Sequence, residues 1–118
     1  MSLKNDFFHI KKTNIESEQS ICFVVEINQH HKVFEGHFPS RPIVPGVFTL
    51  SMIKECVSEY LGRNIVLGKI KECKFVGVLI PKNGLTVELH CTLSAPDKLS
   101  CIVKSEESVV LKLKSEII

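Results

Sequence analysis

The chain has 118 residues, of which 44% are hydrophobic and 24% are charged, and its formal net charge is +2. This length predicts a single domain, residues 1–118, that can bury a core without help from metals or disulfides. The small net charge argues against a nucleic-acid-binding protein, because such proteins usually carry a strongly basic face.

The cysteine content indicates a reducing compartment. The five cysteines are odd in number and form no Cys-x-x-Cys pair, so we expect neither a disulfide framework nor a structural zinc site. No apolar run reaches the roughly 20 residues of a membrane span, and the first residues lack the apolar stretch of a secretory signal. We therefore expect a soluble, cytoplasmic protein that makes no membrane contact.

The first third of the chain predicts two strands followed by a loop. Residues 7–12 are a short candidate strand. Residues 21–27 are a stronger one, because they are apolar at nearly every position, as in a strand covered on both faces. Residues 28–46 contain three prolines, which fix φ and lack a backbone N–H. We expect this segment to be a loop of defined shape and not a helix or a central strand.

Residues 47–61 predict one amphipathic helix, which Gly62 ends. Apolar side chains cover one half of its circumference, and so wide an arc suits a helix packed into a curved sheet. The other half carries the polar residues Ser51, Lys54, Glu55, Ser58 and Glu59.

The rest of the chain predicts only strands. Residues 65–75 and 76–80 are rich in β-forming residues, and residues 85–93, 99–103 and 109–113 alternate between apolar and polar. Their regular spacing between turns indicates an antiparallel meander. One long helix against such a sheet gives an α+β domain.

The start of the predicted helix is the first feature that carries chemistry. Pro45 and Gly46 immediately precede the helix, whose first turn leaves backbone N–H groups without partners. A ligand can approach Gly46 closely because glycine has no Cβ, and the helix dipole favours a developing oxyanion there. The plainer alternative is that these two residues only set the direction in which the chain enters the helix.

The second feature is His37, which lies eight residues before Pro45. Imidazole is the side chain best suited to proton transfer near neutral pH. Apolar neighbours can form a dry wall around it: Phe34, Phe38, Ile43 and Val44. The alternative is a loop histidine that only hydrogen-bonds the backbone. Together, a base and an oxyanion site are what proton abstraction next to a carbonyl requires.

The string GHFPSRPIVPGV, from Gly36 to Val47, resembles the signature of the beta-hydroxyacyl-acyl-carrier-protein dehydratases, GHFPxxPxxPG followed by an apolar helix. The resemblance continues through residues 69–75 and 80–85 and covers roughly residues 20–116. It implies a hot-dog fold, in which a long central helix is wrapped by a curved antiparallel β-sheet. It also implies a dimer with an acyl tunnel at the subunit interface.

The same resemblance implies the reaction and the residue roles. The substrate would be a 3-hydroxyacyl group on the phosphopantetheine of an acyl carrier protein, and the products a trans-2-enoyl thioester and water, with no cofactor in the protein itself. In such enzymes the loop histidine takes the C2 proton and the glycine N–H at the helix start steadies the thioester oxygen. His37 and Gly46 match these two roles, and Pro45, Val47 and Phe38 would lie around the substrate.

The family also uses a carboxylate one turn into the helix of the partner subunit, and this chain has Ser51 at that position. General acid–base groups typically contribute about 10²–10⁴-fold to a rate, so the change bears directly on activity. Glu55 shares the helix face of Ser51 and is a candidate substitute, although a solvated glutamate is the plainer reading. Glu35 is another carboxylate near His37.

The other histidines are expected to be surface or turn residues, and no spacing among them indicates a metal site. They are His9, His30, His31 and His90.

Three functions stay open on the sequence. The first is an active dehydratase, a lyase with an altered acid. The second is a non-catalytic hot-dog subunit that binds acyl carrier protein or completes a heterodimer with a full dehydratase, in place of a homodimer. The third is an acyl thioesterase on the same fold. The intact GHFP loop argues against the third function, as does the lack of an obvious carboxylate between Gly46 and Glu55.

Overall fold

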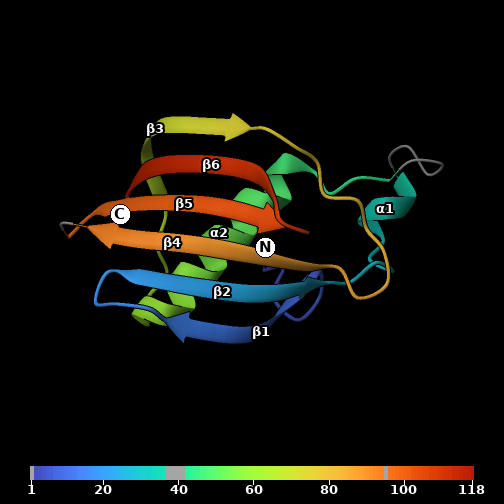
Figure 1. Ribbon diagram of the computed structural model, residues 1–118, viewed down its shortest axis with the longest axis horizontal. Coiled ribbons are helices and arrows are strands. Elements are labelled where there is room, and N and C mark those ends of the chain that lie inside the picture. Colours follow the sequence, from blue (N-terminus) through green and yellow to red (C-terminus); the bar gives the residue numbers. More distant parts are fainter. Residues whose placement is uncertain (1, 37–41, 95) are drawn as a thin grey trace.

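A computed structural model of the chain describes residues 2–36, 42–94 and 96–118. In this part of the chain, six strands form one antiparallel sheet, and helix α2, Gly46–Leu61, crosses one face of it (Figure 1). The strands are β1 Phe8–Ile15, β2 Ser20–Ile27, β3 Leu67–Phe75, β4 Thr86–Ser94, β5 Lys98–Ser105 and β6 Ser108–Ile117. The predicted α+β architecture, a long helix wrapped by a curved sheet, is confirmed.

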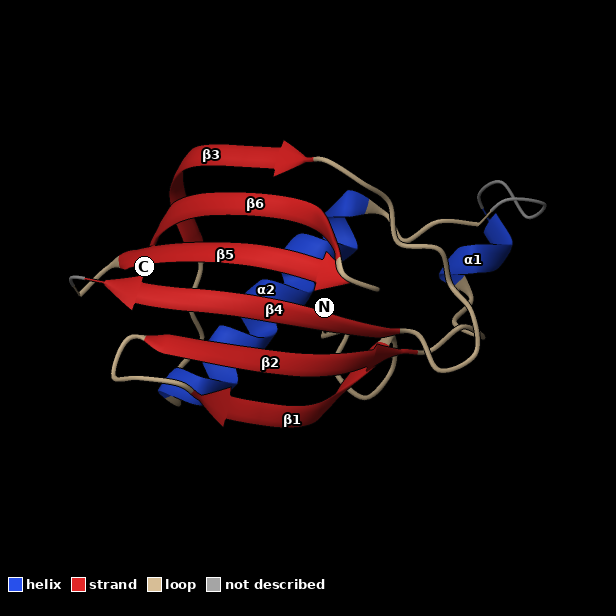
Figure 2. Cartoon of the chain, in the orientation of Figure 1, coloured by secondary structure: helices blue, strands red, loops and turns tan. Residues whose placement is uncertain are grey.

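The strand order in the sheet is β1-β2-β4-β5-β6-β3. Strands β4, β5 and β6 pair in chain order, which is the meander that their alternating patterns predict. Strand β3 precedes them in the sequence but pairs with β6 at the far edge, and β1 lies at the opposite edge beside β2 (Figure 2). One edge of β3 is therefore left without a partner strand within the described chain.

Two predicted elements differ from the structure. Residues 76–80 do not form a strand, because the N–H groups of Val76 and Gly77 both donate to the carbonyl of Val110, at 2.9 and 3.2 Å, and the regular ladder ends there. A short helix, α1 Val33–Gly36, interrupts the segment expected to be loop throughout. It lies beyond one end of the sheet (Figure 1).

Helix α2 supplies one side of the core. Met52, Ile53, Cys56 and Val57 are at most 1% exposed, because they lie on the apolar arc that the sequence predicts. Gly62 ends the helix with φ 72° and ψ 22°, and its N–H donates to the carbonyls of Ser58 and Glu59. Such a left-handed C-terminal residue favours glycine, so this predicted boundary is confirmed.

The inward faces of the strands supply the other side of the core. Cys91 on β4 and Cys101 on β5 are direct partners in the sheet, and their Sγ atoms lie 3.4 Å apart in the interior. Burial raises the pKa of the Cys56 thiol, and the hydrogen bond with Cys101, together with burial, raises the pKa of Cys91. Both thiols therefore serve as small apolar groups at neutral pH.

In the described part of the chain, no helix is both long enough and apolar enough to cross a membrane.

Candidate active site

The first turn of α2 presents free backbone donors. Pro45 precedes the helix in an extended conformation, and its carbonyl accepts the N–H groups of Phe48 and Thr49 at 3.0 and 3.3 Å. No described residue accepts a hydrogen bond from the N–H of Gly46 or Val47. Two donors without a partner in the described part of the chain therefore lie at the positive end of the helix dipole, where a partial negative charge is stabilised.

A cavity of about 460 Å³ opens beside these donors. Its wall combines the start of α2 with the end of β3 and the segment after it, and it is mostly apolar, with Ile43, Leu50, Phe75, Val78 and Val110 among the lining residues. The size falls within the range of about 300–1,000 Å³ that is usual for small-molecule sites. The arrangement suits an acyl chain whose polar end reaches the helix terminus.

The ring of Phe75 packs closely against Gly46. A Cβ at position 46 would lie 2.7 Å from Cε1 and 2.8 Å from Cζ of that ring. A side chain at this position is therefore incompatible with the observed ring position. The space left by the missing Cβ, which the sequence analysis assigns to a ligand, is therefore filled by the Phe75 ring.

His37 and Phe38 lie outside the described residues. Helix α1 ends at Gly36, immediately before His37. The structure therefore describes the end of α1 and the start of α2 but not the residues between them that include His37. The role of His37 as the base stays a prediction from the sequence.

His31 supports α1, and sequence reasoning missed this role. Its Nδ1 accepts the N–H of Val33 at 3.0 Å, so its Nε2 carries the proton and donates to Asp6 Oδ2 at 3.2 Å. The ring packs edge-on against Phe7, with ring centroids 5.4 Å apart. His31 is 9% exposed and lies in a turn, since its N–H donates to the carbonyl of Asn28 and its carbonyl accepts the N–H of Phe34, so it is a turn residue as predicted but a buried one. These contacts join the start of α1 to the N-terminal segment.

Ser51 and Glu35 do not share the cavity with Gly46. Ser51 is half-buried on α2 and is not among the residues that line the cavity. Glu35 is exposed on α1.

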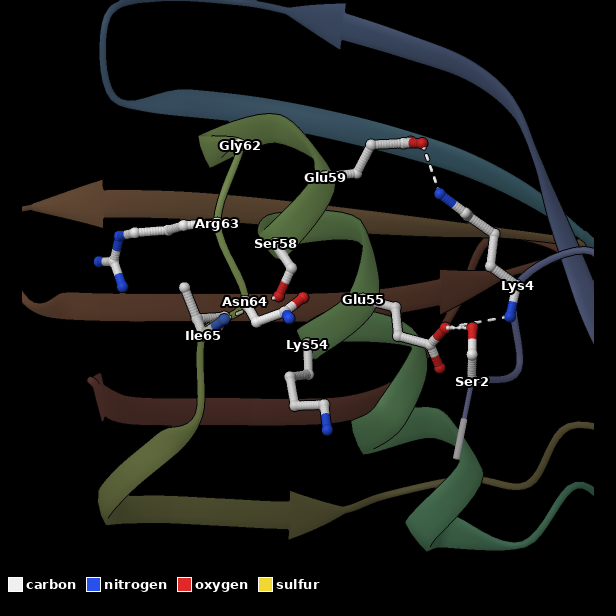
Figure 3. A pocket seen from close by; sticks show the side chains of 10 residues that line it. All are labelled: Ser2, Lys4, Lys54, Glu55, Ser58, Glu59, Gly62, Arg63, Asn64 and Ile65. Carbon is white, nitrogen blue, oxygen red and sulfur yellow. Dashed lines mark hydrogen bonds and ion pairs between the residues drawn. The ribbon is translucent and has the colours of Figure 1, made fainter.

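The Glu55 carboxylate is bound by the N-terminal segment (Figure 3). Its Oε2 accepts the N–H of Leu3 at 2.9 Å, and its Oε1 accepts the N–H of Lys4 at 3.0 Å and the hydroxyl of Ser2 at 2.9 Å. These contacts lie in a separate, polar cavity of about 610 Å³ that Gly46 does not line. The structure therefore does not bring Glu55 to the cavity at Gly46.

Several large apolar side chains around the cavity face solvent. We call them the apolar rim: Val47, Phe75, Val76, Val78 and Ile80, which are between 53% and 67% exposed. A concentration of exposed apolar side chains of this kind marks an interaction surface. The apolar rim adjoins the edge of β3 that lacks a partner strand.

The fold, a long helix against one face of a curved antiparallel sheet, is that of the hot-dog proteins. A family model described as ApeI-like, ApeI dehydratase, matches residues 12–113, and the chain belongs to this family.

Curated relatives agree with this family. A protein named 3-hydroxyacyl-[acyl-carrier-protein] dehydratase FabZ from Lactobacillus helveticus is 28% identical over 113 residues, covering 86% of this chain and 75% of the relative. The protein of the same name from Latilactobacillus sakei is 37% identical over 76 residues, covering 58% of this chain and 51% of the relative. These matches thus span between about half and three quarters of the relatives' own length.

Solved structures show the same fold. The structure described as the dehydratase heterocomplex ApeI:P from Xenorhabdus doucetiae superposes with a TM-score of 0.77 at 18% identity, covering 92% of this chain and 95% of that one. The thioesterase HI1161 from Haemophilus influenzae superposes with a TM-score of 0.57 at 11% identity, covering 98% and 81%. Because this fold also carries thioesterases, the function must be argued from the site.

Proposed function

We propose that this chain dehydrates a 3-hydroxyacyl group carried on acyl carrier protein to the trans-2-enoyl thioester, in fatty-acid or related acyl-chain synthesis. The observation that carries the proposal is the pair of free N–H groups at Gly46 and Val47 beside an apolar cavity. Membership of a dehydratase family supports the same reaction.

In the proposed reaction, the imidazole of His37 removes the C2 proton. The negative charge that develops on the thioester oxygen is stabilised by the N–H of Gly46, at the positive end of the α2 dipole. The C3–O bond then breaks, and the leaving hydroxyl takes up a proton to become water. Ser51 of the partner subunit would deliver this proton through a water molecule, since Ser51 does not line the cavity of its own chain.

Phosphopantetheine on the carrier protein would bring the substrate, so the protein itself needs no cofactor. The acyl chain would lie in the cavity between Leu50 and Phe75, and Pro45, Val47 and Phe38 would border its thioester end. The free thiols and the carrier-protein substrate fit a cytoplasmic location.

We further propose that the active form is a dimer of hot-dog subunits. The apolar rim is highly exposed in the single chain, and the free edge of β3 can accept another strand. A dimer that covers the apolar rim would also enclose the cavity at Gly46.

A second candidate is a subunit of a heterodimer, non-catalytic by itself. Two observations favour it: Ser51 replaces the carboxylate on α2, and the ApeI:P structure is described as a dehydratase heterocomplex. In that arrangement a partner subunit would supply the carboxylate to the cavity at Gly46, and this chain would contribute the oxyanion site.

The test is to incubate the purified chain with 3-hydroxyacyl thioesters of acyl carrier protein and to follow the enoyl-thioester absorbance and the mass of the acyl group. A dehydratase produces a species lighter by one water. Turnover that appears only after a complete dehydratase subunit is added would select the heterodimer, and release of free acid would select the thioesterase. If the acyl group stays unchanged under every condition, the proposed reaction is wrong.

A further inference from the structure

Three side chains that are typical zinc ligands converge on the face of the sheet opposite α2. Cys22 lies on β2, and Glu88 and His90 lie on β4. Their ligand atoms all lie within 4.8 Å of one another. We propose that these three residues form a binding site for a divalent transition-metal ion, with Zn²⁺ as the ion that best fits this ligand set.

The sheet register brings the three residues together. Cys22 and His90 are direct partners across the antiparallel pair of β2 and β4. Glu88 precedes His90 by two residues, so both side chains point to the same face of the strand. The sequence neighbours of Cys22, Ile21 and Phe23, point to the other face and are buried in the core. The convergence therefore follows from regular strand geometry.

The distances are close to those of a bound zinc site. The Sγ of Cys22 lies 4.0 Å from Nε2 of His90, and the same nitrogen lies 2.9 Å from Oε1 of Glu88. Usual zinc–ligand bond lengths in tetrahedral geometry place S and N about 3.6 Å apart, and N and O about 3.4 Å apart. Shifts of about half an ångström, available through side-chain rotation, would bring these two pairs to coordination distances, and the third pair, Cys22 and Glu88, lies within 4.8 Å.

The core does not account for a thiol at this position. Cys56, Cys91 and Cys101 fill the interior as small apolar groups. Cys22 instead lies on the outer face of the sheet, where neighbouring side chains leave it 5% exposed. Its cover is partly polar, since it includes the half-exposed Glu88–His90 pair. A soft thiolate, an imidazole and a carboxylate are the ligands that zinc takes in proteins.

The accessibility of the site fits uptake from solution. The side chains of His90 and Glu88 are 34% and 53% exposed, so an ion can reach the buried thiol between them. Three protein ligands leave a fourth position for water. A bound ion would link β2 to β4, two strands that are far apart in the sequence. It would not touch the cavity at Gly46, which lies on the helix side of the sheet. The metal site and the proposed dehydration therefore stand or fall separately.

The test is a titration of the full chain, kept reduced, with Co²⁺ as a spectroscopic substitute for Zn²⁺. We expect one equivalent of Co²⁺ to produce a thiolate-to-cobalt charge-transfer band together with visible bands of tetrahedral intensity, and Zn²⁺ to remove both. Cys22→Ser should abolish the charge-transfer band. His90→Gln and Glu88→Gln should each weaken binding at least tenfold, because loss of even an outer partner of a metal ligand typically costs about 10–100-fold.

Cys73→Ser is the matched control, because Cys73 is a half-buried thiol on β3, at the far edge of the sheet. It should leave the titration unchanged. Glu88 is exposed, so Glu88→Gln keeps the test valid even if Cys22→Ser folds poorly. The proposal is overturned if the wild-type protein shows no charge-transfer band at millimolar Co²⁺. It is equally overturned if the band survives in folded Cys22→Ser, or if Glu88→Gln and His90→Gln bind as tightly as the wild type.

Discussion

The ring of Phe75 lies against Gly46 so closely that a Cβ at position 46 would come within 2.7 Å of Cε1. This contact joins the end of β3 to the start of α2 and forms one side of the cavity. With the Phe75 ring in this position, only glycine fits at the point where the thioester oxygen is proposed to bind.

Gly46→Ala should therefore displace the Phe75 ring and slow dehydration, while the protein stays folded. Phe75 is 53% exposed, so the ring can move at small cost, and we expect less than about 1.5 kcal/mol of lost unfolding free energy. The measurements are urea unfolding and initial rates. In a Phe75→Ala background the stability cost of Gly46→Ala should shrink, because the clash is gone, and an unchanged cost would contradict the contact.

Glu55 should prove to be a structural residue of the N-terminal segment. Its carboxylate accepts the N–H groups of Leu3 and Lys4, so Glu55→Ala should cost about 1–3 kcal/mol of unfolding free energy and speed amide exchange at both residues. Glu59→Ala is the control, because its ion pair with Lys4 is exposed and should contribute little to stability. A Glu55→Ala protein that keeps its stability but loses turnover would instead point to a catalytic role.

Ser51→Glu should raise the dehydration rate if the rest of the site is intact. The variant restores a carboxylate at the position where the family carries one, and a general acid contributes up to about 10²–10⁴-fold. Ser51→Gln, which adds the same bulk without an ionisable group, is the control for steric effects. Equal rates for the Glu and Gln variants would contradict the placement of the acid at position 51.

Alkaline pH should destabilise the fold through Cys56. Burial is the main cause that raises the pKa of this thiol above its ordinary value of 9.0, so the folded state holds the proton after the unfolded chain has released it. Stability is then fully present below about pH 9 and falls as the pH rises further, because the unfolded state binds fewer protons.

Urea unfolding between about pH 8 and about pH 10 measures this effect, where the two limits are about one unit below and above the ordinary thiol value of 9.0. Cys56→Ala should make the decline shallower, whereas Cys73→Ala, at a half-buried position, should change it less. Identical slopes in the wild type and in Cys56→Ala would show that the buried thiol does not contribute.

Much of the architecture follows from local patterns in the sequence. The helix end at Gly62 is predicted because a left-handed terminal residue favours glycine, and the β4–β6 meander follows from alternating residues between turns. The segment 76–80 was predicted wrongly because its apolar side chains resemble those of a strand. In the structure Val76, Val78 and Ile80 form part of the exposed apolar rim, and only Leu79 is buried in the core.

What the sequence could not give depends on contacts between distant residues. The pairing of β3 with β6, the capture of Glu55 by the backbone of Leu3, and the burial of His31 against Phe7 each join segments with no local signal. Cys22 and His90 likewise converge only through the sheet register, so spacing along the chain gives no indication of a shared site.

The most direct test of the proposed function is the rate of enoyl-thioester hydration, the reverse reaction, by the wild type and by His37→Gln. Glutamine keeps hydrogen-bonding capacity but cannot act as a base, so we expect a loss of about 10²–10⁴-fold while the unfolding free energy is unchanged. If the wild type hydrates the thioester and His37→Gln does so at the same rate, proton transfer by this imidazole is contradicted.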